Sequence, residues 1–244
     1  MSNTWSILGA TSSMARAFGR AVVARGDGVL LCGRDMDDLK ASASDAAARG
    51  APVAEAMAFD ARDANSFAPI LKRAEGLDGT VSVAVFVGSM PPQEEIDANP
   101  DLIAGTIADS YGGPATFLTA IAPMLEEKGG AVVGVGSVAG DRGRLGNYVY
   151  GSAKAGFHTY LAGLRNRLGR SDVHVVTVKP GFVDTAMTWG LEGMFLVASP
   201  EKVAHDILRA VDKGRNVIYT PFFWWGIMSI IKSIPEPIFK KLSV

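Results

Sequence analysis

Short apolar runs recur along the whole chain, and each has the length of one buried β-strand. They cover residues 5–8, 29–32, 53–59, 81–87, 131–135, 173–178 and 217–219. Most of these runs are continuously apolar rather than alternating, which is typical of strands that are buried on both faces. The pattern therefore predicts seven short strands in the interior of the protein.

Segments with helical spacing of apolar residues lie between these runs. They cover residues 13–24, 37–48, 65–75, 102–127, 147–168 and 200–212. Strands that alternate with helices along a chain form a parallel sheet with helices on both faces. We therefore predict an α/β protein, a single Rossmann-like, doubly wound domain over residues 1–244, without a linker or an internal repeat.

Composition supports one domain with a large interior and argues against several classes of function. The chain has 244 residues, 48% of them hydrophobic, with 24 basic and 25 acidic residues and a formal net charge of −1. This balance gives no general attraction to phosphate, so no nucleic-acid partner is expected. The three histidines are scattered and Cys32 is the only cysteine, so we expect no metal site and no disulfide within the chain.

The N-terminus adds a prediction about localisation. Residues 1–5 lack the basic start and the long apolar core of a signal peptide, and the chain enters a strand almost at once. Together with the single cysteine, this favours a cytoplasmic protein.

Tyr150 and Lys154 stand four residues apart in the predicted helix at 147–168. Side chains four apart share one helix face, so the phenol and the ammonium can point into one site. A nearby positive charge lowers the pKa of a phenol, which makes it a usable proton donor and acceptor. Such a pair is also common on helix surfaces, where it has no catalytic role. Ser137, however, ends a buried strand, and open parallel sheets bind ligands at such strand ends. The presence of Ser137 therefore favours the catalytic interpretation of the pair.

These residues make the chain resemble the short-chain dehydrogenase/reductase family. The resemblance covers nearly the whole chain and rests on a turn at 9–15, Asp60, Ser137, Tyr150 with Lys154, and Pro180-Gly181 followed by Thr185. It implies an oxidoreductase that moves a hydride between a nicotinamide and a carbonyl or secondary alcohol. In that scheme Ser137 would hydrogen-bond the substrate oxygen and Tyr150 would exchange the proton. Lys154 would lower the Tyr150 pKa and bind the nicotinamide ribose.

The resemblance also implies a set of cofactor-binding residues. They are Gly9, Thr11, Ser12, Ser13, Met14, Arg34, Asp60, Gly88, Tyr150, Lys154, Pro180, Gly181, Val183 and Thr185. The turn departs from the family pattern, because Ser13 and Ala15 replace its second and third glycines. Small residues still let a pyrophosphate approach a helix N-terminus. The alternative is an ordinary strand–helix connection in which Ser12 or Ser13 caps the helix.

Arg34 closes the second strand, at the position that faces the adenosine ribose in this fold. A guanidinium suits the 2′-phosphate of NADP, whereas a carboxylate there would suit NAD. NADP is therefore the expected cofactor, and NAD remains an alternative because Asp35 could bind the ribose or could simply start the next helix. By resemblance Asp60 would contact the adenine, and the alternative for Asp60 is a helix cap.

Two further departures concern the proton relay. The family's Asn-Asn-Ala-Gly segment is Val85-Phe86-Val87-Gly88 in this chain, and Ser110 replaces the asparagine that helps to hold a water near the catalytic lysine. A serine can also bind water, so we include Ser110 among the catalytic residues. The departures leave open an alternative, a dinucleotide-binding regulatory or scaffold protein without turnover. Retention of Ser137, Tyr150 and Lys154 argues against it.

Two apolar segments near the C-terminus bear on the substrate. Residues 187–196 are rich in glycine and large apolar groups, which suggests either a loop that covers an apolar or lipid-linked substrate or a packed surface loop. Residues 221–244 form a mostly apolar helical extension that is too short to span a bilayer. This extension could lie on a membrane, held by its aromatic residues and by Lys232, Lys240 and Lys241, or it could be a core or subunit-interface helix.

The extension and residues 140–155 resemble the subgroup that contains decaprenylphosphoryl-2-keto-pentose reductase, which reduces a keto-sugar carried on a polyprenyl phosphate. The resemblance implies a small-molecule or lipid-linked carbonyl substrate. The family resemblance implies a homo-oligomer, and the apolar extension suggests peripheral contact with the inner face of the membrane.

Overall fold

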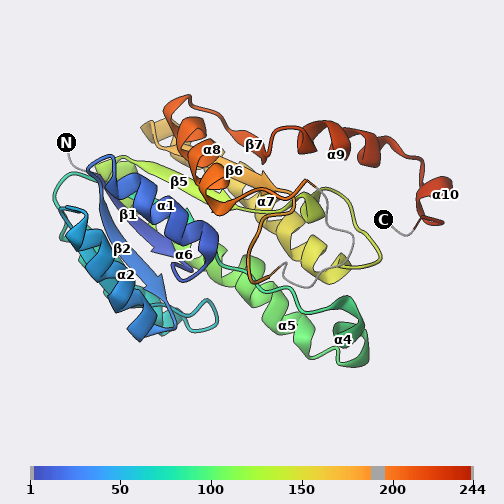
Figure 1. Ribbon diagram of the computed structural model, residues 1–244, viewed down its shortest axis with the longest axis horizontal. Coiled ribbons are helices and arrows are strands. Elements are labelled where there is room, and N and C mark those ends of the chain that lie inside the picture. Colours follow the sequence, from blue (N-terminus) through green and yellow to red (C-terminus); the bar gives the residue numbers. More distant parts are fainter. Residues whose placement is uncertain (1–2, 188–195, 243–244) are drawn as a thin grey trace.

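The computed structural model of the protein describes residues 3–187 and 196–242 (Figure 1). Within these residues, seven parallel strands form one sheet in the order β3-β2-β1-β4-β5-β6-β7. The strands are β1 (Asn3–Leu8), β2 (Gly28–Gly33), β3 (Ala54–Ala58), β4 (Thr80–Val85), β5 (Ala131–Val135), β6 (His174–Pro180) and β7 (Val217–Thr220). The prediction of a Rossmann-like α/β fold is confirmed.

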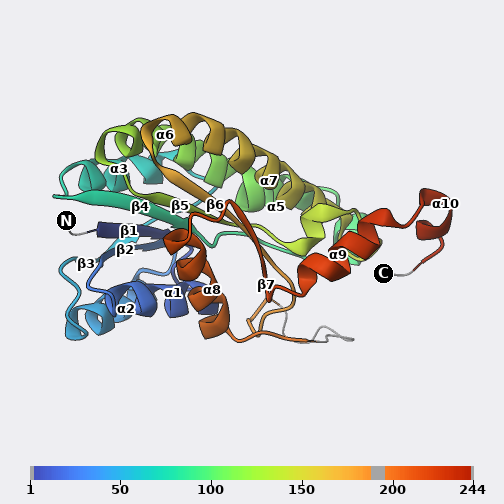
Figure 2. The same cartoon turned by 90° about the horizontal axis from the view of Figure 1, so that it is seen from above.

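Helices cover both faces of the sheet (Figure 2). One face carries α1 (Ser13–Val23), α2 (Met36–Ala48) and α8 (Pro200–Asp212). The other carries α3 (Phe67–Glu75), α6 (Gly113–Lys128) and α7 (Tyr148–Leu168). The remaining helices are α4 (Gln93–Ala98), α5 (Leu102–Ile107), α9 (Trp224–Ser233) and α10 (Glu236–Phe239). These two layers cover the faces of the sheet rather than the carboxyl ends of its strands, which is where ligands bind in such folds.

Each face of the sheet has its own apolar core. On the first face, the fully buried Phe18 of α1 packs edge-on against Trp5 of β1, with a ring separation of 5.0 Å. On the second face, Phe59, Phe67 and Phe117 form a cluster with ring separations of 5.2 to 5.8 Å. Each buried aromatic contributes about 1.5 to 3 kcal/mol by leaving water, so these two layers hold the sheet rigid beneath the site.

The predicted helix at 102–127 is interrupted in the structure. A π-helical turn at Ala108–Gly112 separates α5 from α6, and π turns are often found at functional sites. Helix α4 was not predicted, because it is only six residues long and most of its residues are polar. A 3₁₀ turn at Ala64–Ser66 also precedes α3, within the predicted helix at 65–75.

The strand order reverses between β1 and β4, which opens a crevice at their carboxyl ends. Gly9, at the end of β1, has a φ of +77° and lies against the end of β4. A Cβ at this position would lie 3.1 Å from the carbonyl carbon of Phe86, which leaves too little space for a side chain. The glycine thus brings the first turn close to β4, at the place where the predicted cofactor would bind.

The C-terminal extension lies beyond the carboxyl end of the sheet (Figure 2). Trp224 and Met228 of α9 are buried against Val138, in a separate small core. Arg142 donates hydrogen bonds to the carbonyls of Ile231 (2.6 Å) and Ile234 (2.7 Å) at the end of α9. The inner side of the extension is therefore packed on the body of the protein, while other residues stay exposed. None of the described helices has the length and apolar content needed to cross a bilayer.

Candidate active site

Ser137, Tyr150 and Lys154 come together at the carboxyl end of β5. Ser137 follows this strand and caps the 3₁₀ turn Val138–Asp141 by accepting a hydrogen bond from the Ala139 N–H at 3.1 Å. Tyr150 and Lys154 share a face of α7 and are only 6% and 3% exposed. The phenol of Tyr150 forms a hydrogen bond with the Ser137 side chain. The structure therefore places the three predicted catalytic groups in one buried site.

The Lys154 ammonium lies between the ends of two central strands. It donates hydrogen bonds to the carbonyls of Val135 (3.0 Å) and Val87 (3.2 Å) and lies 5.8 Å from the centre of the Tyr150 ring. Burial lowers the pKa of Lys154 to about 8, because removal from water disfavours the charged form. The two carbonyl oxygens fix the position of the ammonium, and its third N–H bond remains for a ligand.

The Tyr150 phenol behaves differently from the sequence prediction. Burial raises its pKa to about 12, and the hydrogen bond with Ser137 lowers it by less. The expected lowering by Lys154 is wrong for this structure, because the ammonium is directed at the two backbone carbonyls and desolvation dominates. Tyr150 therefore holds its proton at neutral pH.

Ser110 and Gly88 lie close to Lys154. The Ser110 hydroxyl, which is fully buried on the π turn, bonds to both the N–H and the carbonyl of Ser89 at 3.2 Å. A Cβ at Gly88 would lie 3.1 Å from the Lys154 nitrogen and 3.5 Å from the Ser110 oxygen, so the three positions surround one small space. Ser110 is thus near the lysine, but its hydrogen bonds fix the loop after β4.

A cleft of about 380 Å³ lies at the switch point between β1 and β4. Its lining includes six of the predicted cofactor residues: Gly9, Thr11, Ser12, Arg34, Asp60 and Gly88. The Ser12 hydroxyl caps α1 by accepting from the Ala15 N–H at 3.2 Å, and Ser13 begins the helix on its exposed side. The capped N-terminus of α1 therefore borders the cleft, and such an end favours phosphate groups.

Arg34 is exposed on the rim of this cleft. Asp35 caps α2 by accepting from the Asp38 N–H at 3.1 Å, which supports its role as a helix start. Asp60 accepts from the Arg62 N–H at 2.9 Å within a turn, and Asp63 rather than Asp60 caps the following 3₁₀ helix. The helix-cap alternative for Asp60 is therefore wrong, and its side chain lines the cleft beside Arg34.

A second cavity, of about 110 Å³, lies beside Ser137 and Tyr150. It is lined by Met14, Pro180, Gly181, Val183 and Thr185, which are all predicted cofactor residues. Met14 follows the Ser12 and Ser13 positions, so both cavities border the start of α1. The predicted cofactor residues are thus divided between these two cavities. Of the predicted loop at 187–196, residues 188–195 lie outside the described part of the chain.

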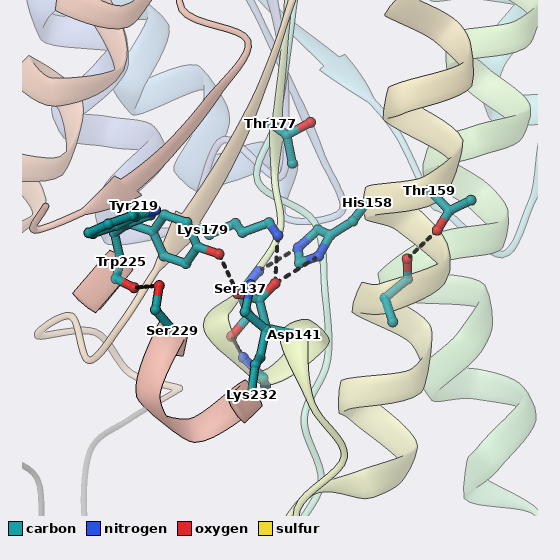
Figure 3. A network of polar contacts seen from close by, with 12 residues as sticks. Ser137, Asp141, His158, Thr159, Thr177, Lys179, Tyr219, Trp225, Ser229 and Lys232 are labelled. Atoms are coloured by element: carbon teal, nitrogen blue, oxygen red, sulfur yellow. Dashed lines mark hydrogen bonds and ion pairs between the residues drawn. The ribbon is translucent and has the colours of Figure 1, made fainter. Parts of the chain in front are cut away.

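A buried polar network that no sequence pattern predicted lies next to the site (Figure 3). Lys179 and the hydroxyl of Tyr219 both bond to the Asp141 carboxylate, each at 2.5 Å. The His158 Nδ1 lies 3.9 Å from this carboxylate, and its Nε2 accepts a hydrogen bond from the Ser137 N–H at 3.3 Å. His158 thus links the catalytic serine to Asp141, and Figure 3 shows these side chains pointing toward one another.

The His158 ring itself is held in one protonation state, the neutral form. Burial, with a contribution from Lys179, lowers its pKa to about 3, so the ring is neutral and Nε2 is an acceptor. A Cβ at Gly136 would lie 2.1 Å from this nitrogen, which means that only glycine allows the ring to reach the Ser137 backbone. The one available signal in the sequence was the position of His158, one turn after Lys154, which by itself suggests only packing.

Comparisons with known proteins agree with this geometry. The family described as short chain dehydrogenase matches residues 3–194. An uncharacterized oxidoreductase of Mycobacterium tuberculosis is 29% identical, over 97% of this chain and 95% of its own. A short-chain dehydrogenase of Burkholderia cenocepacia, solved with NADP, is 20% identical, covers 100% of this chain and 98% of its own, and has a TM-score of 0.84. One of Sphingobium yanoikuyae, solved with NADPH, is 22% identical, covers 97% of both chains and has a TM-score of 0.80.

The buried Lys154 predicts a specific dependence of stability on pH. Between its pKa of about 8 in the folded state and the ordinary 10.5, the unfolded chain binds more protons, so stability should rise with pH. The free energy of unfolding of the natural protein, minus that of Lys154→Met, should increase by about 3 kcal/mol from pH 8 to pH 10.5. Urea denaturation at several pH values measures this difference.

The control is Lys128→Met, which removes a lysine that also bonds to two carbonyls, those of Glu75 and Leu77, but lies outside the site. If the difference in free energy of unfolding between the natural protein and Lys154→Met stays constant over this pH range, the lowered pKa of Lys154 is contradicted.

Proposed function

The chain belongs to the short-chain dehydrogenase family and is an oxidoreductase of that family, and we propose that it uses NADP to reduce a carbonyl group. The observation that carries this proposal is the buried group of Ser137, Tyr150 and Lys154 beside a cavity. A bound nicotinamide would supply the hydride, and the protein supplies orientation and the proton.

The three side chains can divide the work of proton transfer. Tyr150 holds its proton at neutral pH, which is the form that a general acid needs when a carbonyl oxygen gains negative charge. The Ser137 hydroxyl bonds to the phenol and can also hold the substrate oxygen beside it. Lys154, fixed by two carbonyls, places a buried donor near Tyr150, where it can hold a ribose hydroxyl.

The preference for NADP rests on the rim of the larger cleft. Arg34 is exposed there, and its planar guanidinium suits a 2′-phosphate. Asp35, the residue that could favour NAD, already uses one carboxylate oxygen to cap α2. The NADP and NADPH complexes of the two similar structures support the same assignment.

The substrate cavity supports an apolar or lipid-linked carbonyl compound. Its walls are largely apolar and include Met14, Met90, Val138, Phe182, Met187 and Trp224. Trp224 belongs to the C-terminal extension, so the part of the chain that resembles the decaprenylphosphoryl-2-keto-pentose reductase subgroup also borders the substrate. A lipid-linked keto-sugar is the finer form of this proposal. The alternative without turnover is not favoured, because the catalytic groups are assembled.

We place the protein in the cytoplasm as a homo-oligomer, on the basis of the family, with its extension against the inner face of the membrane. Phe222 and Trp225 are 82% and 66% exposed, and Ile230 is exposed near them. Aromatic side chains next to lysines suit the interface of a bilayer. This part of the extension could therefore hold the enzyme close to a lipid-linked substrate.

Replacing Tyr150 with Phe tests the chemistry. The change keeps the ring but removes the proton donor, so kcat should fall by about 100-fold or more, as expected for lost acid–base catalysis. The assay follows NADPH absorbance with carbonyl compounds that include lipid-linked keto-sugars, and fluorescence titration checks that NADPH still binds. The matched control is Tyr148→Phe, whose exposed hydroxyl bonds to Asp97 instead. Near-normal turnover by Tyr150→Phe would exclude the mechanism.

Replacing Arg34 with Ala tests the cofactor. Loss of a charge-assisted hydrogen bond to the 2′-phosphate should weaken NADPH binding by about 1.5 to 3 kcal/mol and NADH binding much less. Calorimetric titration measures the loss of binding free energy for each cofactor. The variant Arg34→Lys shows how much of the NADPH binding depends on the positive charge alone. Equal losses for NADPH and NADH would contradict the assignment.

The membrane proposal is tested without disturbing the substrate cavity. Deletion of residues 221–244 would remove Trp224 from the cavity wall, so the better variant is Phe222→Ser with Trp225→Ser. Each exposed aromatic that enters a membrane contributes about 1.5 to 3 kcal/mol, so this double variant should lose most of its co-sedimentation with phosphatidylglycerol vesicles. Ile103→Ser with Ile107→Ser, on exposed positions of α5, is the control. Natural protein that stays in the supernatant at low salt would contradict membrane contact.

A further inference from the structure

Two polar side chains interrupt the apolar wall of the cavity beside Tyr150. Arg144 and Asn147 come from the loop between the 3₁₀ turn at Val138–Asp141 and α7, and both line the cavity. The Arg144 Nε and the Asn147 Oδ1 are buried, and neither has a hydrogen-bond partner in the described part of the chain. Buried polar atoms are normally paired, so the Arg144 Nε–H points to an acceptor on a ligand, and the Asn147 Oδ1 points to a donor such as a hydroxyl group.

The charges around the cavity are not balanced by the protein. None of the described residues that line it is acidic. The nearest carboxylate, Asp141, is already bonded to Lys179 and Tyr219, and Lys232 lies 4.0 Å from it. Burial lowers the pKa of Arg144, and Asp141 raises it by less, which shows that the carboxylate only partly compensates the guanidinium. The site therefore carries an excess of positive charge.

We propose that Arg144 binds a negatively charged oxygen group of the substrate, either a phosphate or a carboxylate, next to the carbonyl that faces Tyr150, and that the Asn147 Oδ1 accepts a hydrogen bond from a hydroxyl group of the same substrate. The carbonyl group in this inference rests on the proposed function. The anion-binding site is argued only from the residues that line the cavity. A guanidinium donates two parallel hydrogen bonds to such a group. Arg144 thereby selects acidic substrates over neutral ones.

A purely structural role for Arg144 fits the contacts less well. A guanidinium that stabilises a loop bonds to carboxylates or carbonyls, as Arg142 does with Ile231, Ile234 and Glu236. Arg144 has no such bond to any described residue. Since an unpaired and partly buried charge opposes folding, Arg144→Met should leave the melting temperature unchanged or raise it.

The test measures binding of three aromatic probes that share a ring: phenyl phosphate, benzoate and neutral benzamide. Tryptophan fluorescence reports binding, because Trp224 lines the same cavity. Natural protein should bind one or both anions more tightly than benzamide, and the tighter anion identifies the acidic group. Arg144→Met should weaken anion binding by about 10- to 100-fold, the effect of one lost charge-assisted hydrogen bond, and leave benzamide unchanged. Arg144→Gln is the second variant should Arg144→Met fail to fold.

Arg34→Met is the matched control, because an anion could also bind at the cofactor cleft. Anion binding that survives in Arg34→Met and is lost in Arg144→Met supports the proposal. Loss in Arg34→Met with no loss in the Arg144 variants would overturn it, as would equal binding of all three probes by the natural protein.

Turnover separates this inference from the proposed function. Acetoacetate and its methyl ester present the same ketone with and without a charge, and NADPH absorbance follows their reduction. A preference of natural protein for acetoacetate that disappears in Arg144→Met supports both ideas. If the natural protein reduces both ketones and the Arg144 variants bind the anionic probes as tightly as it does, the proposed function is retained and this inference is overturned. Arg144-dependent anion binding without any NADPH oxidation would overturn the function alone.

Discussion

A single buried carboxylate, that of Asp141, joins four parts of the molecule at the edge of the active site. It bonds to Lys179 of β6 and to Tyr219 of β7, and it lies near His158 of α7 and Lys232 of α9. Burial alone would raise the pKa of Asp141, but the hydrogen bonds from Lys179 and Tyr219 together lower it. The carboxylate therefore stays ionised, and the position of the catalytic loop depends on that charge.

This arrangement makes the C-terminal extension part of the candidate active site, because Trp224 lines its cavity. Arg142, the neighbour of Asp141, holds the end of α9 through backbone carbonyls and stacks on the ring of Phe239, 3.6 Å from its centre. Trp224 then closes one side of the substrate cavity and contacts Phe182 with a ring separation of 5.5 Å. One segment thus has a packed side that shapes the cavity and an exposed aromatic part that is available for another surface.

Burial also sets the electrostatics of the catalytic groups. Exclusion of water raises the pKa of Tyr150 and lowers that of Lys154, so both shifts favour the neutral forms. The protein keeps these groups in place with hydrogen bonds from Ser137 and from two strand ends. Such unfavourable burial is typical of sites where catalysis requires a proton that is easily exchanged.

The sequence by itself determined the seven strands, the parallel sheet and the shared helix face of Tyr150 and Lys154, because each depends on local periodicity or on spacing along one helix or strand. The expectation that Ser137 joins this pair came from the end of a buried strand and from the family resemblance. The sequence also indicated the turn at Gly9 as the place where the sheet would bind a cofactor. Only the tertiary structure showed that Asp141 binds Lys179 and that Trp224 enters the cavity, because these contacts join residues 38 or more positions apart. The same applies to the pKa of Tyr150: the sequence shows the nearby lysine, but desolvation depends on everything that packs around the ring.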